Sequence, residues 1–217
     1  SLVALATSIY GIGYQSQYAG TYSLARFGFF YNIFLASMVV VVLAQHALLF
    51  LFAWEIMAIA SYFLVIFEHR NNSNLRAGFL YLLITQCGTA CLFIAFLLLF
   101  MVSGSWDFTT IRESVGAMSP VIQNIILALA LVGFGSKAGL IPLHIWLPEA
   151  HPAAPSHVSA LMSGVMLKTA IFMVIRFFID FFPTIHPFWG FGLVLLGAIS
   201  SVLGVLYAIA ENDLKRL

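Results

Sequence analysis

The sequence predicts an all-α fold, a bundle of helices that cross a lipid bilayer several times. Hydrophobic residues make up 62% of the 217 positions and charged residues only 8%, whereas soluble domains carry about a quarter charged residues. The mean hydropathy of +1.04 agrees with this composition. The apolar residues form long unbroken runs instead of short alternating segments, which favours helices over a β-barrel. Because lipid offers no hydrogen-bond partner to an open backbone, each run is expected to form a helix.

The apolar runs divide the chain into six predicted spanning helices. Residues 2–12 are apolar but too short to cross a bilayer, so they predict the end of an earlier helix. The run from Phe27 to Phe67 is about twice as long as one span requires, and the polar pair Gln45–His46 divides it. A polar loop is expected at 107–113. The predicted helices cover residues 28–45, 47–67, 76–102, 119–140, 157–181 and 188–210.

Basic residues in the connections predict the orientation of the bundle. When the connections are assigned to alternate sides, one side collects Arg26, Arg70, Arg76, Lys215 and Arg216, and the other collects Arg112 and Arg176. Lysine and arginine gather on the cytoplasmic side of membrane proteins, so the first set is predicted to be cytoplasmic. The connection at 140–156 is then predicted to be cytoplasmic as well.

Both ends of the chain are expected to be cut from a longer sequence. Ser1 opens within an apolar run and lacks the basic stretch that begins a signal peptide. The chain stops at Leu217 without a polar tail.

The composition also argues against several classes of function. A formal net charge of +1 and the lack of a basic run argue against a nucleic-acid partner. The sequence has no glycine-rich phosphate loop, and its histidines and two cysteines follow no zinc, haem or iron–sulfur spacing. We therefore predict no cofactor, no metal and no catalytic residues.

Three ionisable side chains fall near the middle of predicted helices or at a helix break, namely Glu55, Lys137 and Lys168. A charge at a helix centre costs at least about 2.5–3.5 kcal/mol on insertion scales, and residues of this kind usually mark function. A static ion pair that locks two helices together is the alternative, but it would leave one lysine without a partner. An unpaired buried charge is the costliest case, so such a lysine is expected to be neutral part of the time.

This cost suggests a proton relay. Burial lowers the pKa of a lysine and a neighbouring carboxylate raises it. A lysine held between the two influences exchanges its proton near neutral pH, and movement of the carboxylate switches it. Lysine suits this task better than arginine, which does not deprotonate in proteins. We predict Glu55, Lys137 and Lys168 as the proton-translocation sites.

The stretch between the two lysines supports this prediction. Gly139 and Pro142 are expected to break the helix that carries Lys137, and irregular backbone at membrane depth is tolerated only where it faces protein or a water-filled cavity. A simple proline-induced helix end is the alternative. His157 lies eleven residues before Lys168, so the two are expected to share one helix face within about 20°.

Four further residues are candidate relay groups: His144, His151, His157 and Tyr62. Imidazole titrates near neutral pH, which suits a proton entry or exit. Ordinary loop or capping roles for the histidines, and an interfacial position for the tyrosine, are the alternatives.

Three segments resemble a known family. FAWEIMAIASYFLV (52–65), GFGSKAGLIPLHIWLPEAHPAAPSHVSALMSGVMLKTAIFMVIRF (133–177) and AIAENDLKRL (208–217) are similar to the antiporter-like, proton-translocating membrane subunits of respiratory complex I (NADH:quinone oxidoreductase). Within this family, the sequences of the three segments most resemble the hydrogenase 4 component B and formate hydrogenlyase branch. Multisubunit sodium/proton antiporters share the same domain.

The resemblance implies more than the residues alone. Such subunits have about fourteen transmembrane helices and two inverted five-helix repeats. Residues 1–26 would then hold the end of a preceding helix and a loop, 27–181 the first repeat with its broken helix, and 182–217 a following helix with the start of the next loop. The essential glutamate of the family would be Glu55, its central lysine Lys137 and its connecting lysine Lys168.

The function expected from the resemblance is that of a membrane subunit without a redox centre, in a respiratory oxidoreductase or hydrogenase complex of the cell inner membrane. It would translocate protons, or sodium, coupled to electron transfer in partner subunits. A subunit of a sodium/proton antiporter and a non-conducting membrane anchor are the alternatives.

Overall fold

The computed structural model describes residues 2–18, 20–182 and 186–211. These residues form helices and short connections, with one isolated antiparallel bridge between His46 and Asp107. The α-helices are α1 (Leu2–Gln15), α2 (Leu24–Leu43), α3 (Ala47–Val65), α4 (Asn72–Ser103), α5 (Phe108–Ser114), α6 (Pro120–Ala138), α7 (Leu147–Ala153), α8 (Ser156–Leu161), α9 (Leu167–Ile175) and α10 (Pro187–Ala210). The predicted all-α fold is confirmed.

Local sequence signals set several helix ends. Ser23, Asn71 and Ser119 cap α2, α4 and α6, since each side chain accepts a hydrogen bond from a backbone N–H of the first turn. Helix α4 stops at Gly104, whose φ of 68° lies in the left-handed region that glycine adopts without strain.

Six helical segments in the described residues are long and apolar enough to cross a membrane, and they match the predicted spans closely. Two connections differ from the prediction. The loop expected at 107–113 contains α5, and the connection expected at 140–156 contains a 3₁₀ turn at Leu143–Trp146 followed by α7. Lys215 and Arg216, which entered the orientation argument, lie outside the described residues.

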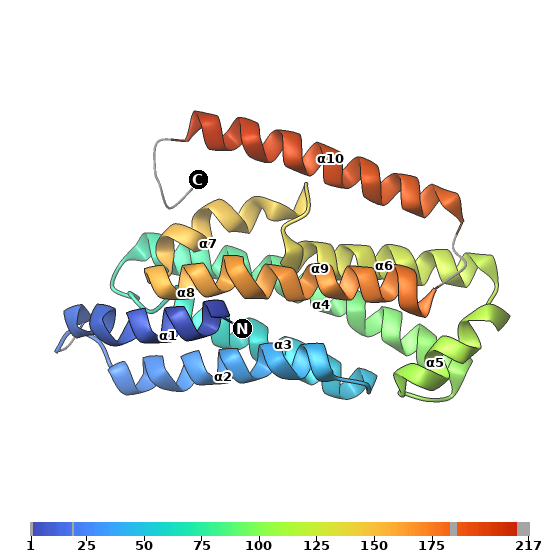
Figure 1. The fold of residues 1–217 in the computed structure, drawn as a ribbon, viewed down its shortest axis with the longest axis horizontal. Helices are drawn as coiled ribbons and strands as arrows, with labels where there is room; N and C mark the ends of the chain where they lie inside the picture. The colour runs from blue at the N-terminus through green and yellow to red at the C-terminus, as the bar shows by residue number, and fades with distance from the viewer. Residues whose placement is uncertain (1, 19, 183–185, 212–217) are drawn as a thin grey trace.

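The bundle is built around two closely packed helix pairs (Figure 1). Helix α2 lies along α3, and α4 lies along α6. Glycines allow α4 and α6 to pack closely. A Cβ at Gly88 would overlap the side chain of Ser136, and a Cβ at Gly133 would overlap Leu92. Helix α10 runs along one side of the bundle, and none of its residues is buried.

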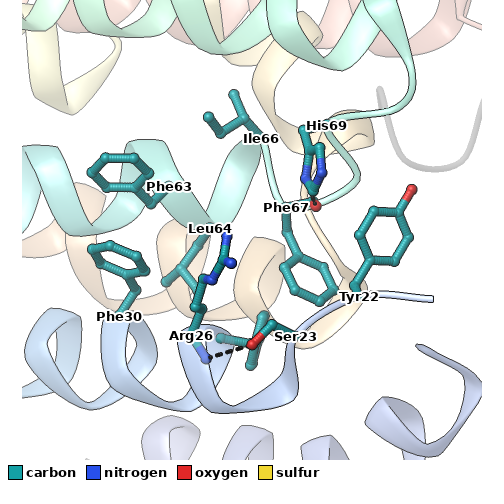
Figure 2. A pocket seen from close by; sticks show the side chains of 10 residues that line it. Tyr22, Ser23, Arg26, Phe30, Phe63, Leu64, Ile66, Phe67 and His69 are labelled. Carbon is teal, nitrogen blue, oxygen red and sulfur yellow. Dashed lines mark hydrogen bonds between the residues drawn. The ribbon is translucent and has the colours of Figure 1, made fainter. Parts of the chain in front are cut away.

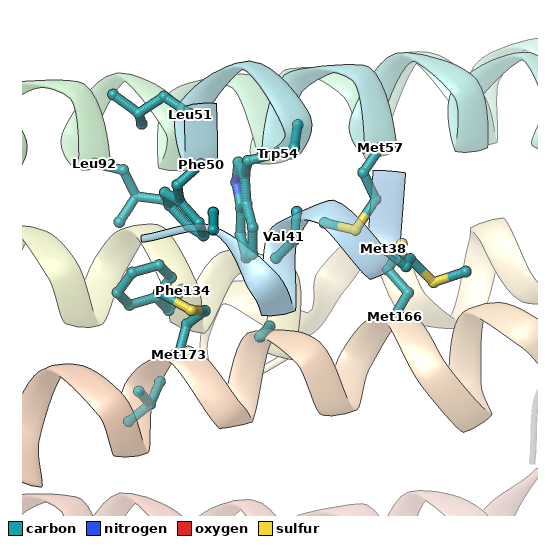
Figure 3. Packing of buried hydrophobic residues seen from close by; sticks show 14 of the residues in the cluster. Met38, Val41, Phe50, Leu51, Trp54, Met57, Leu92, Phe134, Met166 and Met173 are labelled. Carbon is teal, nitrogen blue, oxygen red and sulfur yellow. The ribbon is translucent and has the colours of Figure 1, made fainter. Parts of the chain in front are cut away.

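Large apolar side chains fill the centre between the two pairs (Figure 3). Phe50 and Trp54 of α3 meet Phe134 of α6, with ring centroids 6.1 and 5.6 Å apart. Leu92 of α4 and Met173 of α9 close the same cluster, and all five side chains are buried. This apolar core lies directly beside the residues of the candidate site.

Two π-helical segments interrupt the last helix of the predicted five-helix unit. One covers Met162–Met166, between α8 and α9, and the other covers Arg176–Phe181 at its end. A π-helical turn holds more residues than an α-helical one, so residues on either side of it lose their α-helical phase.

Candidate functional site

The helix break predicted at Gly139 and Pro142 is present. Helix α6 ends at Ala138, and Gly139 has a φ of 74°. The chain then steps sideways near the middle of the bundle before α7 continues in the same direction (Figure 1). The indole N–H of Trp146 donates to the carbonyl of Ser136 at 2.7 Å, which satisfies a carbonyl in the last turn of α6.

Lys137 occupies this last turn and is fully buried, with 0% exposure. Its ammonium nitrogen has no hydrogen-bond partner among the described residues. It lies 5.7 Å from the ring centroid of Trp54 and 5.4 Å from that of Tyr81. Both distances are within the range of a cation–π interaction, which is worth about 2 kcal/mol or more when the cation is desolvated. Ring faces therefore offset much of the cost of the charged amine without accepting its proton.

Glu55 approaches the same region from α3. Its Oε2 accepts a hydrogen bond of 2.9 Å from the side-chain amide of Gln86 on α4, while its buried Oε1 has no partner among the described residues. Glu55 is close enough to Lys137 and to Tyr81 for a Coulombic interaction with each. In the described part of the chain, however, the ion pairs within 4.0 Å all involve Asp180, so Glu55 and Lys137 are not in direct contact.

Tyr81 interacts with both Lys137 and Glu55 and links several elements. Its hydroxyl is 2.6 Å from the hydroxyl of Ser61 on α3 and 3.7 Å from the sulfur of Met166. Its ring packs at 4.8 Å against Trp146. The site around Lys137 is thus a closed aromatic compartment with a hydroxyl pair on one wall.

Lys168 lies near the middle of a spanning segment as predicted, but its side chain is exposed in the described structure instead of buried. Its ammonium donates to the carbonyl of Ser163 at 2.9 Å. The side chain lines a cavity of about 670 Å³ between the α7–α8 region and α10. Residues of α10, none of which is buried, form the facing wall of this cavity.

Two of the candidate histidines line the same cavity as Lys168. The Nδ1 of His151 is 2.8 Å from the hydroxyl of Ser159, which also faces the cavity. The ring of His144 lies 6.1 Å from that of Tyr207 on α10, and its Nδ1 is buried without a hydrogen-bond partner in the described part of the chain. Serine hydroxyls at positions 156, 163 and 200 complete a polar lining.

His157 lies elsewhere, and the shared face predicted for His157 and Lys168 is wrong. Its ring is surrounded by the rings of Tyr10, Tyr14, Phe27 and Tyr31, with centroids 5.1–6.5 Å away. It is buried, and neither ring nitrogen has a partner among the described residues. The π-helical segment at Met162–Met166 lies between the two residues and shifts the phase that α-helical counting assumed.

Tyr62 is half-buried on α3, where its ring packs against Phe63 at 5.3 Å. It also faces Gly78 of α4, since a Cβ at that glycine would lie 3.3 Å from the tyrosine ring. The structure therefore places Tyr62 at the α3–α4 contact, not in the aromatic compartment.

The sequence reasoning missed Gln86, Tyr81 and Trp54, which contact Glu55 or Lys137. Trp54 directly precedes Glu55 in the chain, and this adjacency was the one available signal. Gln86 and Tyr81 come from α4, and nothing in their local sequence indicates that they face the two charged residues.

Comparison with known proteins adds to this geometry. A family model described as NADH:quinone oxidoreductase/Mrp antiporter, TM, matches residues 44–217. The chain belongs to this family. The resemblance inferred from the three motif segments is thereby confirmed, and the chain is a multi-pass membrane protein.

The relatives of this chain include a hydrogenase component, an antiporter subunit and an oxidoreductase subunit. Hydrogenase-4 component B of Escherichia coli (strain K12) is 45% identical over 219 residues, which are 100% of this chain and 32% of that protein. A putative antiporter subunit of Staphylococcus epidermidis is 32% identical, over 99% of this chain and 27% of that protein. NADH-quinone oxidoreductase subunit M of Pseudomonas aeruginosa is 31% identical, over 88% of this chain and 40% of that protein. The chain thus spans about a third of the length of its curated relatives.

Two solved structures share the fold. The Mrp complex from Dietzia sp. DQ12-45-1b matches with a TM-score of 0.79 and 28% identity, over 87% of this chain and 20% of that one. The membrane-bound sulfane sulfur reductase, an archaeal respiratory membrane complex, matches with a TM-score of 0.74 over 81% of this chain and 36% of that one. Its identity of 19% supports the fold alone.

Proposed function

We propose that this chain belongs to a proton-translocating membrane subunit of an energy-converting respiratory oxidoreductase or hydrogenase complex in the cell inner membrane. Lys137 is the switchable proton carrier, Glu55 is the carboxylate that tunes it, and Lys168 is the next site. Other membrane subunits are its partners, and electron transfer in the partner subunits drives the movement of protons.

One observation carries the proposal, namely a fully buried amine beside a broken helix with no hydrogen-bond partner among the described residues. A permanently charged lysine would need a contacting acid, and a purely structural lysine would be replaceable by an apolar residue. Lys137 instead has ring faces that tolerate the charge and a carboxylate that acts from beyond contact distance. Both protonation states are therefore accessible, which is what a proton carrier requires.

The cavity beside Lys168 supplies the connection to one end of the bundle. It is lined by His144, His151 and serine hydroxyls, which are groups that exchange or relay protons. It runs from the helix break at Gly139 toward the turn that precedes α8. We propose His144 and His151 as relay residues between solvent and Lys168.

The test is substitution of Lys137 in the full-length protein within its complex. We expect Lys137→Ala to leave assembly and electron transfer intact but to abolish proton uptake by inverted membrane vesicles. Lys137→Arg is expected to fail as well, because arginine keeps its proton. The matched control is Arg76→Gln, which removes a basic residue outside the compartment.

Unchanged proton uptake in Lys137→Ala would overturn the proposal. Loss of assembly in both Lys137 variants, with normal uptake by any complex that still forms, would instead support a structural membrane anchor.

A second candidate function is a subunit of a multisubunit sodium/proton antiporter. The match to the Mrp complex, with a TM-score of 0.79 and 28% identity, favours it. Sodium-dependent proton flux in vesicles that lack any electron donor would identify this function. Flux that requires an electron donor would identify the first.

A further inference from the structure

A groove at one end of the bundle carries an inference that does not depend on proton translocation. The groove lies between the first turns of α2 and the last turns of α3 and has a volume of about 250 Å³. The same end carries Arg26, Arg70 and Arg76, and we call it the basic end. Figure 2 shows the groove and the side chains that line it.

The walls of the groove are apolar and aromatic. Phe30 of α2 and Phe63 of α3 stack with ring centroids 4.4 Å apart, and Phe63 is 40% exposed. Phe27 and Phe67 form the inner part of the wall, with ring centroids 4.9 Å apart. An acyl chain can lie against such a surface, and a hydrophilic ligand would gain nothing from it.

Positive charge faces the groove without an ion-pair partner among the described residues. The Arg26 side chain extends along Leu64, between the Phe30–Phe63 pair and Phe67 (Figure 2). His69 lies at the rim, and the guanidinium of Arg70 is 5.6 Å from the ring centroid of Tyr22, another lining residue. In the described residues both ion pairs within 4.0 Å are made to Asp180, so neither arginine has a carboxylate partner there.

The acid nearest in sequence to this rim is already engaged. Glu68 accepts a hydrogen bond of 2.6 Å from the Tyr18 hydroxyl. Burial, reinforced by this hydrogen bond, raises the pKa of the Tyr18 phenol, so Tyr18 remains a proton donor to Glu68. Glu68 therefore directs its carboxylate to Tyr18 and forms no ion pair within 4.0 Å with either arginine in the described residues, so both guanidinium groups stay available to an anion.

Arginine charge beside an aromatic trough at membrane-interface depth is complementary to one kind of ligand. We propose that the groove binds an anionic phospholipid, with the phosphate at Arg26 and an acyl chain along Phe30 and Phe63. Basic pockets at the ends of transmembrane helices recognise lipid headgroups through the same combination of charge and apolar surface. A zwitterionic lipid lacks the net charge that Arg26 and Arg70 select, and inorganic phosphate lacks the chain that the phenylalanines select.

The test is native mass spectrometry of the full-length protein purified in mild detergent and titrated with dioleoyl phosphatidylglycerol. We expect Arg26→Gln to weaken phosphatidylglycerol binding about fivefold, because one basic side chain is worth about 1 kcal/mol at an anionic surface and 1.4 kcal/mol is a factor of ten. Arg26→Lys should retain most of the affinity. Arg76→Gln is the matched control, since Arg76 lies at the basic end but outside this groove, and it should bind like the wild type.

A photoreactive phosphatidylglycerol then locates the bound lipid. We expect crosslinks within residues 23–30 or 63–69 in the wild type, and about fivefold weaker crosslinking there in Arg26→Gln at a lipid concentration below the wild-type Kd. Equal phosphatidylglycerol affinity in the wild type and Arg26→Gln would overturn the proposal. Equal affinity of phosphatidylethanolamine for the groove would also overturn it, as would full displacement of the lipid by inorganic phosphate.

Discussion

At the scale of single residues, the environment of Lys137 explains how a membrane helix tolerates a lysine. A charge at a helix centre costs at least about 2.5–3.5 kcal/mol on insertion scales. Cation–π interactions with the rings of Tyr81 and Trp54, at 5.4 and 5.7 Å, offset a large part of this cost. Unlike a contacting carboxylate, which would fix the amine in the charged state, the rings leave no unpaired opposite charge behind when the amine loses its proton.

Gln86 is predicted to position the Glu55 carboxylate. Gln86→Leu removes the donor at 2.9 Å from Oε2 and adds no charge. A hydrogen bond to a charged group is worth about 1.5–3 kcal/mol, so we expect proton uptake by vesicles to fall about tenfold or more with assembly intact. The control is Gln123→Leu, because Gln123 contacts backbone carbonyls near the α5–α6 connection. Equal losses in the two variants would contradict a specific role for Gln86.

His151 and His157 are predicted to respond differently to the same substitution. Neither nitrogen of His157 has a partner in the described structure, so replacement by a ring of similar shape is nearly neutral. We expect His157→Phe to change stability by less than about 1 kcal/mol and to leave proton uptake unchanged. His151→Phe removes the contact with Ser159 in the cavity and should slow uptake. Slower proton uptake in His157→Phe, with normal uptake in His151→Phe, would instead indicate that His157 is the relay residue.

At the scale of the elements, breaks in helices decide where the polar groups point. Helix α6 ends beside Lys137 because Gly139 turns into the left-handed region, and the chain resumes as α7. In the last predicted span, the π-helical segment at Met162–Met166 separates the faces of His157 and Lys168. One residue then contacts α1 and the other faces α10.

Gly139 is predicted to be essential for this break. An alanine there would occupy a φ of 74°, which costs about 1–2 kcal/mol, and its Cβ would overlap Leu147. We expect Gly139→Ala to lower the thermal unfolding temperature of the purified protein and to reduce proton uptake. Gly13→Ala in α1 is the matched control, since nothing lies within 4 Å of a Cβ at that position. A Gly139→Ala protein as stable as this control would show that the left-handed turn is dispensable.

At the scale of the whole molecule, the packing is tight on one side and open on the other. The two helix pairs enclose Lys137 in an aromatic core, whereas the space next to α10 holds a polar cavity with Lys168. Away from this cavity, α1 contacts α8 through the rings around His157. The closed and the open regions meet at the helix break.

The orientation of the bundle is predicted from its basic end. We expect a membrane-impermeant maleimide to label Asn72→Cys from the cytoplasmic side and Glu113→Cys from the other side, in a protein whose Cys87 and Cys91 are replaced by alanine. Residues 72 and 113 are exposed and lie at opposite ends of the bundle. Labelling from the reversed sides would invert the topology, and labelling of both from one side would contradict the six spans.

Much of this protein was predictable because its energetics are local. Transfer of apolar side chains into lipid and the satisfaction of backbone groups determine where helices run, so the spans and the break at Gly139 follow from the order of residues. The cost of a charge in lipid singles out Glu55 and Lys137 in the same way. None of these inferences requires knowledge of which helix is the neighbour.

The tertiary structure alone decided what surrounds those residues. Gln86 and Tyr81 reach the site because α4 packs against both α3 and α6. Lys168 lines a cavity whose facing wall comes from α10. A π-helical turn moved His157 off the expected face. Contacts of this kind depend on the rotation and spacing of whole helices, and a linear pattern of residues does not encode them until the helices are packed.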